Sequence, residues 1–464
     1  MTSLRESKDK IFSFIVILVD ILLINLGFYI PFMIKFNFSP PEINIVPYIE
    51  IIPFITIAAL LYFDLYGLLA VFRKSLYETL YSIFFAVVLL SITTMAITYF
   101  NQGFSFPRSI LLMAPVIQIS LLTLWRIFVW ETKKFVLDTR KVAVIGSTLE
   151  EVTNIVEKIR GSASNMLLDI KYSCDTSDID NVLRYIDLAD EVFVCSSVSN
   201  RDRVKIIGYC INKGKGIYII PDLSEILLYK SHMLQFDDVP TFAVENLKLS
   251  SGQRYMKRGF DIAVSLVGTV ILLPIMAIVA ASIKLNSKGT AIYSQERVTR
   301  EGKTFKLYKF RTMVEDAEKK TGPVMSVEGD NRVTQVGNIL RKLRLDEIPQ
   351  LFNVLTGAMS IVGPRPERPH FVEQFKKEIP GYEYRTSVKA GITGLAQVLG
   401  KYTTIPEDKL RYDLLYIRNY SILFDIKIIL QTLKVAFMGQ SSEGFNKYVN
   451  ENLEKAPVGN IVGN

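Results

Sequence analysis

The sequence predicts a membrane protein built from three successive parts, and three observations support this fold class. Long apolar runs with almost no charge fill residues 1–135. Short strand and helix patterns alternate in residues 136–248, and residues 249–440 read as α-rich with one further apolar run. A chain of 464 residues has room for roughly three domains. We therefore expect a four-helix transmembrane bundle, an α/β domain and an α-rich domain, followed by a polar tail at 441–464.

The first part contains four candidate membrane spans. A spanning helix needs about 20 consecutive apolar residues. Four stretches approach this length with at most one charge each: residues 11–34, 43–63, 79–107 and 109–125. The first is too long for a cleaved signal peptide, and no small-residue cleavage site follows it. Asp20 lies inside this run, and we expect it to make a buried polar contact between helices.

The distribution of lysine and arginine predicts how these spans are oriented. Short cytoplasmic loops carry an excess of these residues. The cations before the first span, after the second and at the end of the fourth are Arg5, Lys8, Lys10, Arg73, Lys74, Arg126, Lys133 and Lys134. The opposite side has only Lys35 and Arg108. Both ends of the bundle should therefore lie in the cytoplasm.

The middle part has the pattern of a small doubly wound α/β domain. Buried strands are expected at 141–146, 191–195 and 216–220, with helical stretches between them. The dinucleotide-binding fingerprint is missing, because the turn after Gly146 contains no second or third glycine. A structural or regulatory role is therefore favoured over nucleotide binding.

Composition excludes several kinds of site. The chain has three cysteines (Cys174, Cys195 and Cys210), and their odd number and spacing predict plain core residues. Only His232 and His370 are histidines, too few for a histidine-rich metal site or a Ser-His-Asp triad. A net charge of +8 suits an anionic membrane surface. No aromatic-basic module accompanies that charge, so no nucleic acid is expected as a partner.

A fifth apolar run, residues 262–283, is expected to enter and leave the membrane on the same face. Its flanking cations are Arg254, Lys257, Arg258, Lys284 and Lys288. Pro274, near the middle, removes a helix hydrogen bond and predicts a bend. We therefore predict a proline-kinked re-entrant helix at about 255–285. A kinked ordinary span is the alternative, because proline is tolerated in membrane helices.

Two adjacent carboxylates, Asp346 and Glu347, are the strongest candidates for a reactive site. Pro349 follows them, and the residue before a proline avoids the helical conformation. The preceding helix should therefore end near Glu347 or Ile348, and a new one should run from Pro349 to Gly357. The pair would then lie in a break between helices, near backbone N–H groups that favour anions. A kinked continuous helix is the alternative geometry, and it would expose the same pair. Taken alone, a carboxylate pair beside a basic run is more often a solvated ion-pair cluster.

Four further motifs give this pair its context. They are Phe305–Met313 (FKLYKFRTM), Gly363–Glu367 (GPRPE), Ala390–Gln397 (AGITGLAQ) and Lys409–Tyr416 (KLRYDLLY). With five motifs in this order, residues 252 to about 440 resemble the bacterial sugar transferase family, the monotopic phosphoglycosyl transferases. Ala390 and Leu395 depart from the proline and tryptophan of many members, which affects inferences about local loop shape.

The resemblance extends to the rest of the chain. The middle part resembles the Rossmann-like domain that lies between the membrane bundle and the catalytic domain of several bacterial polysaccharide-assembly proteins. The whole chain resembles the long polyprenyl-phosphate hexose-1-phosphate transferases, which start capsule or exopolysaccharide synthesis. This implies a multi-pass protein of the bacterial inner (cytoplasmic) membrane, with a monotopic catalytic domain on the cytoplasmic face.

The resemblance also implies a reaction and its partners. Hexose-1-phosphate would move from a UDP-sugar to undecaprenyl phosphate, with release of UMP. UDP-glucose is the first expectation and UDP-galactose the second, on family frequency. Membrane lipids and a second copy of the chain are further candidate partners.

Roles for individual residues follow from the same resemblance. Asp346 is the expected nucleophile, forming a covalent phosphosugar intermediate, and Glu347 assists as a metal ligand or base. Asp346 and Glu347 are the expected ligands of Mg²⁺, the expected cofactor. The expected substrate-binding residues are Lys309, Arg311, Arg341, Pro364, Arg365 and Pro366. Arginine pairs two phosphate oxygens at once, and neighbouring prolines would hold Arg365 stiffly. We expect the cations to keep Asp346 ionised.

Two rival functions and one structural alternative stay open. A membrane-bound nucleotide-sugar dehydratase or epimerase could share the N-terminal half, although the missing glycine fingerprint disfavours it. A catalytically inert assembly scaffold is disfavoured by the carboxylate pair and the arginines. Residues 405–438 have helical amphipathic spacing, which suits either the membrane surface or packing in the core.

Overall fold

The protein forms two compact units, Met1–Pro221 and Asp222–Glu443, in the computed structural model. The described residues are 2–71, 74–100, 107–136, 139–160, 168–176, 178–314, 332–400 and 404–438. The expected polar tail at 441–464 and the flanking cation Arg73 lie outside them.

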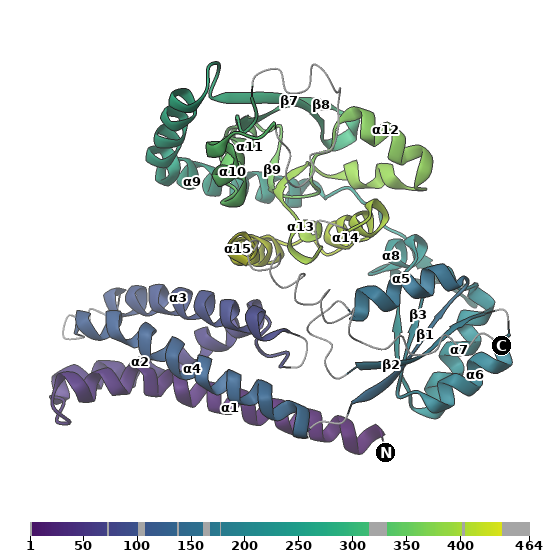
Figure 1. Cartoon of the computed structure of the whole chain (residues 1–464), viewed down its shortest axis with the longest axis horizontal. Helices are drawn as coiled ribbons and strands as arrows, with labels where there is room; N and C mark the ends of the chain where they lie inside the picture. Colours follow the sequence, from purple (N-terminus) through teal and green to yellow (C-terminus); the bar gives the residue numbers. More distant parts are fainter. Residues whose placement is uncertain are drawn as a thin grey trace. The chain divides into compact units, whose positions relative to one another are not determined.

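Within the described residues, five helices are long and apolar enough to cross a membrane. Four of them belong to the first unit: α1 (Thr2–Lys35), α2 (Glu42–Leu65), α3 (Leu76–Phe100) and α4 (Arg108–Val136). They occupy the four apolar runs of the sequence, and α1 and α4 lie side by side (Figure 1). These helices associate the chain with a membrane, whereas their orientation across it stays a prediction.

A buried ion pair joins α1 to α4. The Asp20 carboxylate accepts hydrogen bonds from Arg126, whose Nε lies 3.2 Å from Asp20 Oδ1. The same guanidinium donates to the Leu68 carbonyl oxygen at 3.1 Å. The polar contact expected of Asp20 is therefore present. Arg126, which the sequence suggested as a flanking cation, lies inside the helix packing instead.

A parallel four-stranded sheet with order β2-β1-β3-β4 completes the first unit. Its elements are β1 (Arg140–Gly146), α5 (Leu149–Arg160), β2 (Leu168–Asp175), α6 (Ile179–Leu188), β3 (Glu191–Val194), α7 (Asn200–Lys213) and β4 (Gly216–Ile219). Val142 and Val144 pack under α5, whereas the intervening strand positions pack against α6 and α7. The three strands expected from the sequence occur, and all three cysteines are buried as predicted. Strand β2 was missed because it is a half-exposed edge strand without a continuous apolar run.

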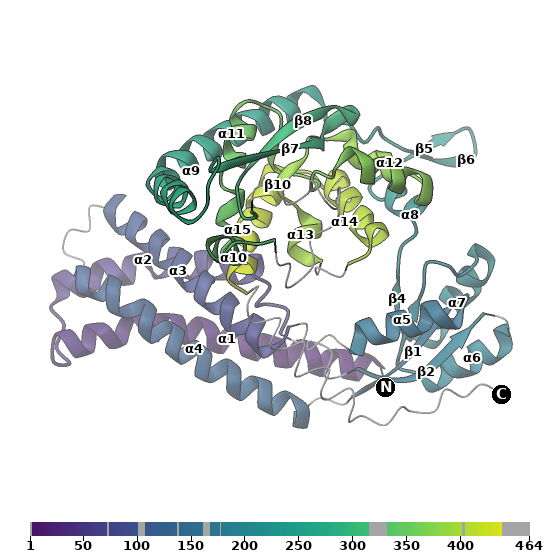
Figure 2. The ribbon, with the colours of Figure 1, turned by 45° about the horizontal axis from the view of Figure 1, so that its top comes forward.

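The second unit contains one long helix, several shorter helices and three two-stranded sheets, with a larger and a smaller cluster of buried apolar side chains. Its helices are α8 (Leu223–Leu228), α9 (Ser251–Asn286), α10 (Gln335–Lys342), α11 (Gln350–Leu355), α12 (Pro369–Glu378), α13 (Leu395–Leu399), α14 (Pro406–Arg418) and α15 (Ile422–Met438). Its strands are β5 (His232–Phe236), β6 (Val239–Ala243), β7 (Ile292–Val298), β8 (Thr304–Phe310), β9 (Ser360–Val362) and β10 (Gly391–Thr393). The hairpin β5–β6 projects from this unit (Figure 2). Helix α8 belongs here because Ile226 is buried in the larger of these clusters.

Helix α9 contains the fifth apolar run. Its first residues are capped by Ser250, whose side-chain oxygen accepts from the Gln253 N–H at 3.2 Å. Both ends of the run contact the second unit: Asp261 is buried near the start, and Ile283 is buried near the end against β8 and α10. Between them, apolar side chains such as Val270 and Ile271 are each 66% exposed. The helix is continuous through Pro274, and its re-entrant course stays a prediction.

The amphipathic segment 405–438 divides into two helices with different surroundings. Helix α14 buries Leu410, Leu414 and Ile417 in the core. Helix α15 buries Asp425 and Ile428 and exposes Leu423, Leu433 and Phe437, while its remaining apolar side chains are partly buried. Core packing therefore accounts for α14, whereas α15 keeps an apolar surface.

Candidate active site

The two carboxylates lie in a short break between α10 and α11. Helix α10 ends at Lys342, and Arg344 follows with a left-handed φ of 55°. Asp346 and Glu347 then form a 3₁₀ turn, and α11 begins at Gln350. The expected helix end near Glu347 is therefore wrong. The left-handed residue stops α10 before the conformational restriction from the proline is reached.

Glu347 is held by two cations from separate elements. Lys309, on β8, lies with its Nζ 2.7 Å from Glu347 Oε1. Arg365, just after β9, donates from Nη2 to the same oxygen at 2.8 Å. Burial favours the protonated form, but the charges of Arg365 and Lys309 hold the pKa of Glu347 well below its usual range. Glu347 is therefore a fixed anion.

Asp346 is half-buried and has no hydrogen-bond partner among the residues that the structure describes. Burial raises the pKa of Asp346, and the neighbouring Glu347 raises it further, against the opposing charges of Lys309, Arg341 and Arg365. The three cations favour ionised Asp346, as expected, although the direct bonds of Lys309 and Arg365 go to Glu347. The Asp346 carboxylate is left available to a ligand.

Two other predicted substrate-binding arginines have different positions. Arg341, on α10, donates from Nε to Thr312 Oγ1 at 2.9 Å and acts on Asp346 through its charge. Arg311 is buried and donates to the backbone oxygens of Ser287 and Lys288 at 3.0 and 2.6 Å. The guanidinium of Arg311 is therefore bonded to the end of α9, and a substrate role for this residue stays a prediction.

The loop that carries Pro364, Arg365 and Pro366 is set by close backbone packing. Gly363 N–H donates to the Thr393 carbonyl oxygen, and Gly391 N–H donates to that of Pro364, each at 2.9 Å. A Cβ on Gly363 would lie 2.3 Å from the Lys389 carbonyl oxygen, so only glycine fits. The packing between the parallel strands β9 and β10 thus fixes the backbone of the loop that carries Arg365.

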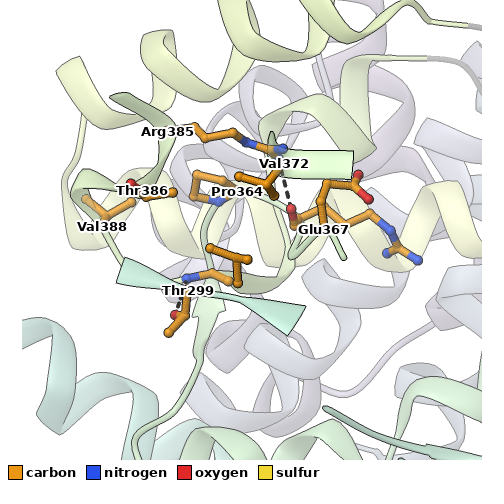
Figure 3. Close-up of a pocket in the computed structure, with 10 residues that line it drawn as sticks. Thr299, Pro364, Glu367, Val372, Arg385, Thr386 and Val388 are labelled. Atoms are coloured by element: carbon orange, nitrogen blue, oxygen red, sulfur yellow. Dashed lines mark hydrogen bonds between the residues drawn. The ribbon is translucent and has the colours of Figure 1, made fainter. Parts of the chain in front are cut away.

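Arg385, which sequence reasoning did not single out, and Asp413, which lies in the KLRYDLLY motif, support this loop. Arg385 Nη2 donates to the Arg365 carbonyl oxygen at 2.9 Å, beside Pro364 (Figure 3). The same guanidinium pairs with Asp413 Oδ2 at 2.9 Å, and both side chains are buried. A hollow of about 20 Å³, room for about one water molecule, lies between Arg385, Arg365 and Glu367. Arg385 and Asp413 are positioning residues, because they act on Arg365.

A second buried network ties the same loop to the base of α9. Asp261 Oδ1 accepts from Ser360 Oγ at 3.0 Å and from the Ile361 N–H at 3.1 Å. Lys257 Nζ lies 2.7 Å from Asp425 Oδ2. The Tyr416 hydroxyl lies 2.8 Å from Asp425 Oδ1 and 3.1 Å from the Val362 carbonyl oxygen. Strand β9 is thus fixed by groups on the apolar helix.

This arrangement suits group transfer involving phosphate. It places an available carboxylate beside a fixed one, with an arginine on a rigid loop and a lysine on a hairpin next to them. Cations of this kind stabilise charge on phosphoryl oxygens. The fold and the site together define a membrane-associated protein in which two adjacent carboxylates lie beside cations from separate elements.

Comparison with known proteins gives the family. The bacterial sugar transferase family matches residues 252–439. A Bacillus subtilis (strain 168) protein provisionally named as an undecaprenyl-phosphate N-acetylgalactosaminyl 1-phosphate transferase is 53% identical over 134 residues, 28% of this chain and 74% of its own length. This chain belongs to the bacterial sugar transferase family, as its motifs indicated.

Longer relatives are similar over about half of their sequence. UDP-N-acetylgalactosamine-undecaprenyl-phosphate N-acetylgalactosaminephosphotransferase of Aeromonas hydrophila is 39% identical, over 48% of this chain and 52% of the relative. UDP-glucose:undecaprenyl-phosphate glucose-1-phosphate transferase of Escherichia coli (strain K12) is 35% identical, over 54% of this chain and 55% of the relative. The chain thus spans little more than half the length of these relatives.

Proposed function

We propose that the protein transfers a sugar-1-phosphate from a UDP-sugar to undecaprenyl phosphate, as a first membrane step in capsule or exopolysaccharide synthesis. The observation that carries this proposal is the available Asp346 beside Glu347, which Lys309 and Arg365 hold in place. Membership of the bacterial sugar transferase family and the names of its relatives support the same reaction class.

The transfer proceeds in two displacements at one phosphorus atom. An Asp346 oxygen attacks the phosphorus that bears the hexose, the bond from that phosphorus to the UMP oxygen breaks, and UMP leaves with the electron pair. An oxygen of undecaprenyl phosphate then attacks the same phosphorus, and Asp346 leaves as a carboxylate. Dividing the reaction in this way lets the water-soluble and the lipid substrate react in turn.

The cations near Asp346 would bind the UDP-sugar in different ways. Arg365 has a guanidinium with several donors, of which one is used by Glu347, so it can also pair with diphosphate oxygens. Lys309 and Arg341 add positive charge beside Asp346. Pro364 and Pro366 restrict the backbone on both sides of Arg365. We keep Arg311 as a weaker candidate, because its donors already bond the end of α9.

The carboxylate pair fits Mg²⁺ held together with substrate. Glu347 Oε1 bonds two cations, whereas Oε2 and the Asp346 carboxylate have no hydrogen-bond partner in the described part of the chain. The described residues contain no cluster of three or more His, Cys, Asp or Glu side chains that could hold a metal ion. Mg²⁺ is often bound by one or two carboxylates plus substrate phosphates, so Asp346 and Glu347 would hold it in that way. When bound, the ion supplies charge neutralisation for the diphosphate.

Three UDP-sugars are candidates for the donor substrate. UDP-glucose and UDP-galactose follow from the family, and relatives are named for each of these sugars. Two relatives, 39% and 53% identical, are named for N-acetylgalactosamine, so UDP-N-acetylgalactosamine joins the panel.

We further propose that α9 is re-entrant and that the second unit is monotopic on the cytoplasmic face of the inner membrane. Lys257, before the apolar run, bonds Asp425, and Ser287, after it, bonds Arg311. Both ends of the run therefore contact one compact unit. A straight span would separate them by a hydrocarbon layer of about 30 Å. The first unit would then supply a four-span bundle and a Rossmann-like domain whose role is structural or regulatory.

The experiment that tests the reaction measures UMP. Purified full-length protein is given each of the three UDP-sugars, with and without undecaprenyl phosphate. We expect sustained UMP release that needs the lipid, and about one UMP per active site without it, because a covalent intermediate accumulates. Lipid-dependent turnover without such a burst would indicate a single ternary displacement. No UMP from any sugar would favour the scaffold, and stoichiometric bound NAD would favour the dehydratase.

A further inference from the structure

The hairpin of β7 and β8 directs one of its faces at the carboxylate pair. In this antiparallel hairpin Tyr293 lies directly opposite Lys309. Side chains that are directly opposite each other in such a pair project from the same face of the sheet. The Lys309 ammonium lies 2.7 Å from Glu347, so the face that carries Tyr293 is the one directed at the proposed reaction site. The hairpin therefore adds an aromatic side chain to the surroundings of that site.

Hydrogen bonds along β7 fix the position of the Tyr293 side chain. Alternate residues of a strand lie on the same face, and here they are Tyr293, Gln295 and Arg297. Gln295 Nε2 donates to the Tyr293 hydroxyl at 3.1 Å, and Arg297 Nη2 donates to Gln295 Oε1 at 2.7 Å. Arg297 Nη1 in turn donates to the Pro366 carbonyl oxygen at 3.2 Å. The ring of Tyr293 is thereby linked to the loop that carries Arg365.

Tyr293 combines this fixed position with exposure to solvent. The residue is 41% exposed, whereas Gln295 and Arg297 beside it are partly buried. The neighbouring Lys309 and Arg365 carry charges that suit phosphate oxygens. An aromatic ring instead suits a flat and uncharged part of a ligand, because its faces are apolar. The side chains on this face therefore match two chemically different parts of one substrate.

The proposed donor substrate has one flat aromatic part, the uracil ring. Aromatic side chains bind nucleobases by stacking, since every base has a π face. The Cβ atoms of opposite residues in a hairpin are about 5 Å apart, so the Tyr293 ring starts close to the stem of Lys309. Ribose joins the uracil ring to the diphosphate. A base on Tyr293 would thus leave the diphosphate beside Lys309 and Arg365.

We infer that Tyr293 is the stacking platform for the uracil ring of the UDP-sugar, and of UMP after the first displacement. Gln295 and Arg297 are positioning residues for this ring. The inference rests on the proposed function, because it names a further contact of the same substrate. All three candidate donors share the uracil ring, so the platform contributes to affinity for the nucleotide and leaves the choice of hexose to other contacts.

Isothermal titration of the full-length protein in detergent tests the platform, with UMP and glucose 1-phosphate as separate probes. Both probes carry a phosphate, but only UMP carries a base. Tyr293→Ala and Tyr293→Leu should each weaken UMP binding about tenfold, as when a stacked base loses its aromatic partner. Tyr293→Phe keeps the ring and should bind UMP nearly as tightly as the parent. Glucose 1-phosphate should bind equally to the parent and to all three variants.

Tyr308→Ala is the matched control. Tyr308 is 36% exposed on the same hairpin, but it precedes Lys309 by one residue and so projects from the opposite face. This change should leave UMP binding unaltered. Thermal unfolding of each variant identifies any loss of folding.

Tyr293→Trp gives a second readout that keeps an aromatic ring in place. Uracil stacked on the new indole should quench its fluorescence, and glucose 1-phosphate should not. The two native tryptophans, Trp125 and Trp130, lie on α4, and the parent protein supplies their background signal. Unquenched emission from Tyr293→Trp at saturating UMP would contradict the platform.

The outcomes separate this inference from the proposed function. A parent protein that binds no UMP would contradict the transfer reaction together with the platform. If the parent binds UMP and folded Tyr293→Ala and Tyr293→Leu bind it equally well, the platform alone is overturned. Equal loss in Tyr293→Ala and Tyr308→Ala would also overturn it, because disruption of the hairpin would then be the cause. Weaker binding of glucose 1-phosphate to Tyr293→Ala would place the hexose on the ring and would overturn the assignment to uracil.

Discussion

Asp346 and Glu347 are neighbours in sequence but differ in their contacts. Glu347 accepts bonds from Lys309 and Arg365, which keep it ionised. Asp346 has no such bond within the described residues, and the adjacent anion adds to the effect of burial in raising its pKa. A carboxylate of raised pKa is more basic and less stabilised by its surroundings, which suits a nucleophile. The difference supports the proposal that Asp346 is the attacking group and that Glu347 provides a fixed charge.

Asp346→Asn should abolish turnover while leaving UDP-sugar binding largely intact. The amide keeps the shape of the side chain but cannot form the phosphosugar intermediate. We expect UMP release to fall by about 10³-fold or more, as when an enzyme loses its nucleophile. Isothermal titration with the UDP-sugar measures binding, and Glu383→Gln, on the exposed part of the same unit, is the control. Retained activity in Asp346→Asn would remove the residue from this role.

Asp413 should make the stability of the protein depend on pH. Burial raises the pKa of Asp413 to about 6, although Arg385 opposes this shift. The pKa of Asp413 in the folded protein lies above its ordinary value of 3.8. The stability that protonated Asp413 contributes is therefore complete below pH 3.8 and is lost as the pH rises through about 6. In Asp413→Asn this pH dependence should disappear. Melting temperatures of both proteins between these two pH values measure it, and parallel curves would contradict the assignment.

Single residues were predictable where a motif or a charge pattern identified them. The carboxylate pair and Arg365 were found in this way, and the structure places Lys309 with them. Asp413 lies in the KLRYDLLY motif, on the buried face of α14 with Leu410 and Leu414, but the sequence analysis assigned it no role. Its partner could not be found from the sequence, because Arg385 lies 28 residues away and nothing in the sequence specifies that pairing.

At the scale of elements, the approach of β9 and β10 makes a direct prediction. In Gly363→Ala the new methyl group would lie 2.3 Å from the Lys389 carbonyl oxygen and 3.0 Å from the Gly391 nitrogen. Backbone atoms cannot move aside as a flexible side chain can, so we expect destabilisation of about 1–3 kcal/mol or more. Thermal unfolding and UMP release should both decline, because the loop that carries Arg365 is displaced.

Gly259→Ala is the matched control for this change. Gly259 lies in α9, and a Cβ there would meet no atom within 4 Å. Alanine is favoured over glycine in a helix by about 1 kcal/mol, so this variant should be as stable as the parent or slightly more stable. Equal destabilisation by both substitutions would show that close packing at Gly363 is not the cause.

Helices and strands were predicted well where the hydrophobic periodicity was strong. They were predicted less well where local backbone geometry determined the end of an element. The apolar helices and the three central strands follow directly from their sequence patterns. The end of α10 was placed too late, because Arg344 adopts a left-handed conformation that glycine usually signals. The helices within 405–438 needed the structure, since the same spacing suits a core or a lipid surface.

At the scale of the whole molecule, cysteine labelling tests the course of α9. With Cys174, Cys195 and Cys210 replaced, single cysteines at Gly252 and Lys288 should both be shielded from an impermeant thiol reagent in intact cells. Lys288 is preferable to Gly289, whose φ of 111° would strain any side chain. Both sites should react after permeabilisation. Labelling of the Lys288 position alone in intact cells would establish a true span.

The boundary between the two compact units lies at a different place from the domain boundary expected from the sequence. The sequence predicted a boundary at 248/249, from the change between α/β and apolar patterns. The compact units divide at 221/222, because α8 buries Ile226 in the core that α14 lines. A short helix with one buried anchor gives little periodic signal, so its partner could be identified only from tertiary contacts.

The buried chain Lys257–Asp425–Tyr416–Val362 has a mechanical consequence. It joins the base of the apolar helix α9 to the strand that carries the Arg365 loop, through contacts of 2.7, 2.8 and 3.1 Å. A helix whose hydrophobic length does not match the bilayer changes its tilt or depth, at a cost of fractions of a kcal/mol per ångström. The site should therefore respond to bilayer thickness. UMP release in vesicles of increasing acyl-chain length should pass through an optimum, and this dependence should flatten in Lys257→Met/Asp425→Leu, which removes both charges together. If parent and double variant shared the same dependence, this chain would not transmit the thickness of the membrane to the reacting carboxylate.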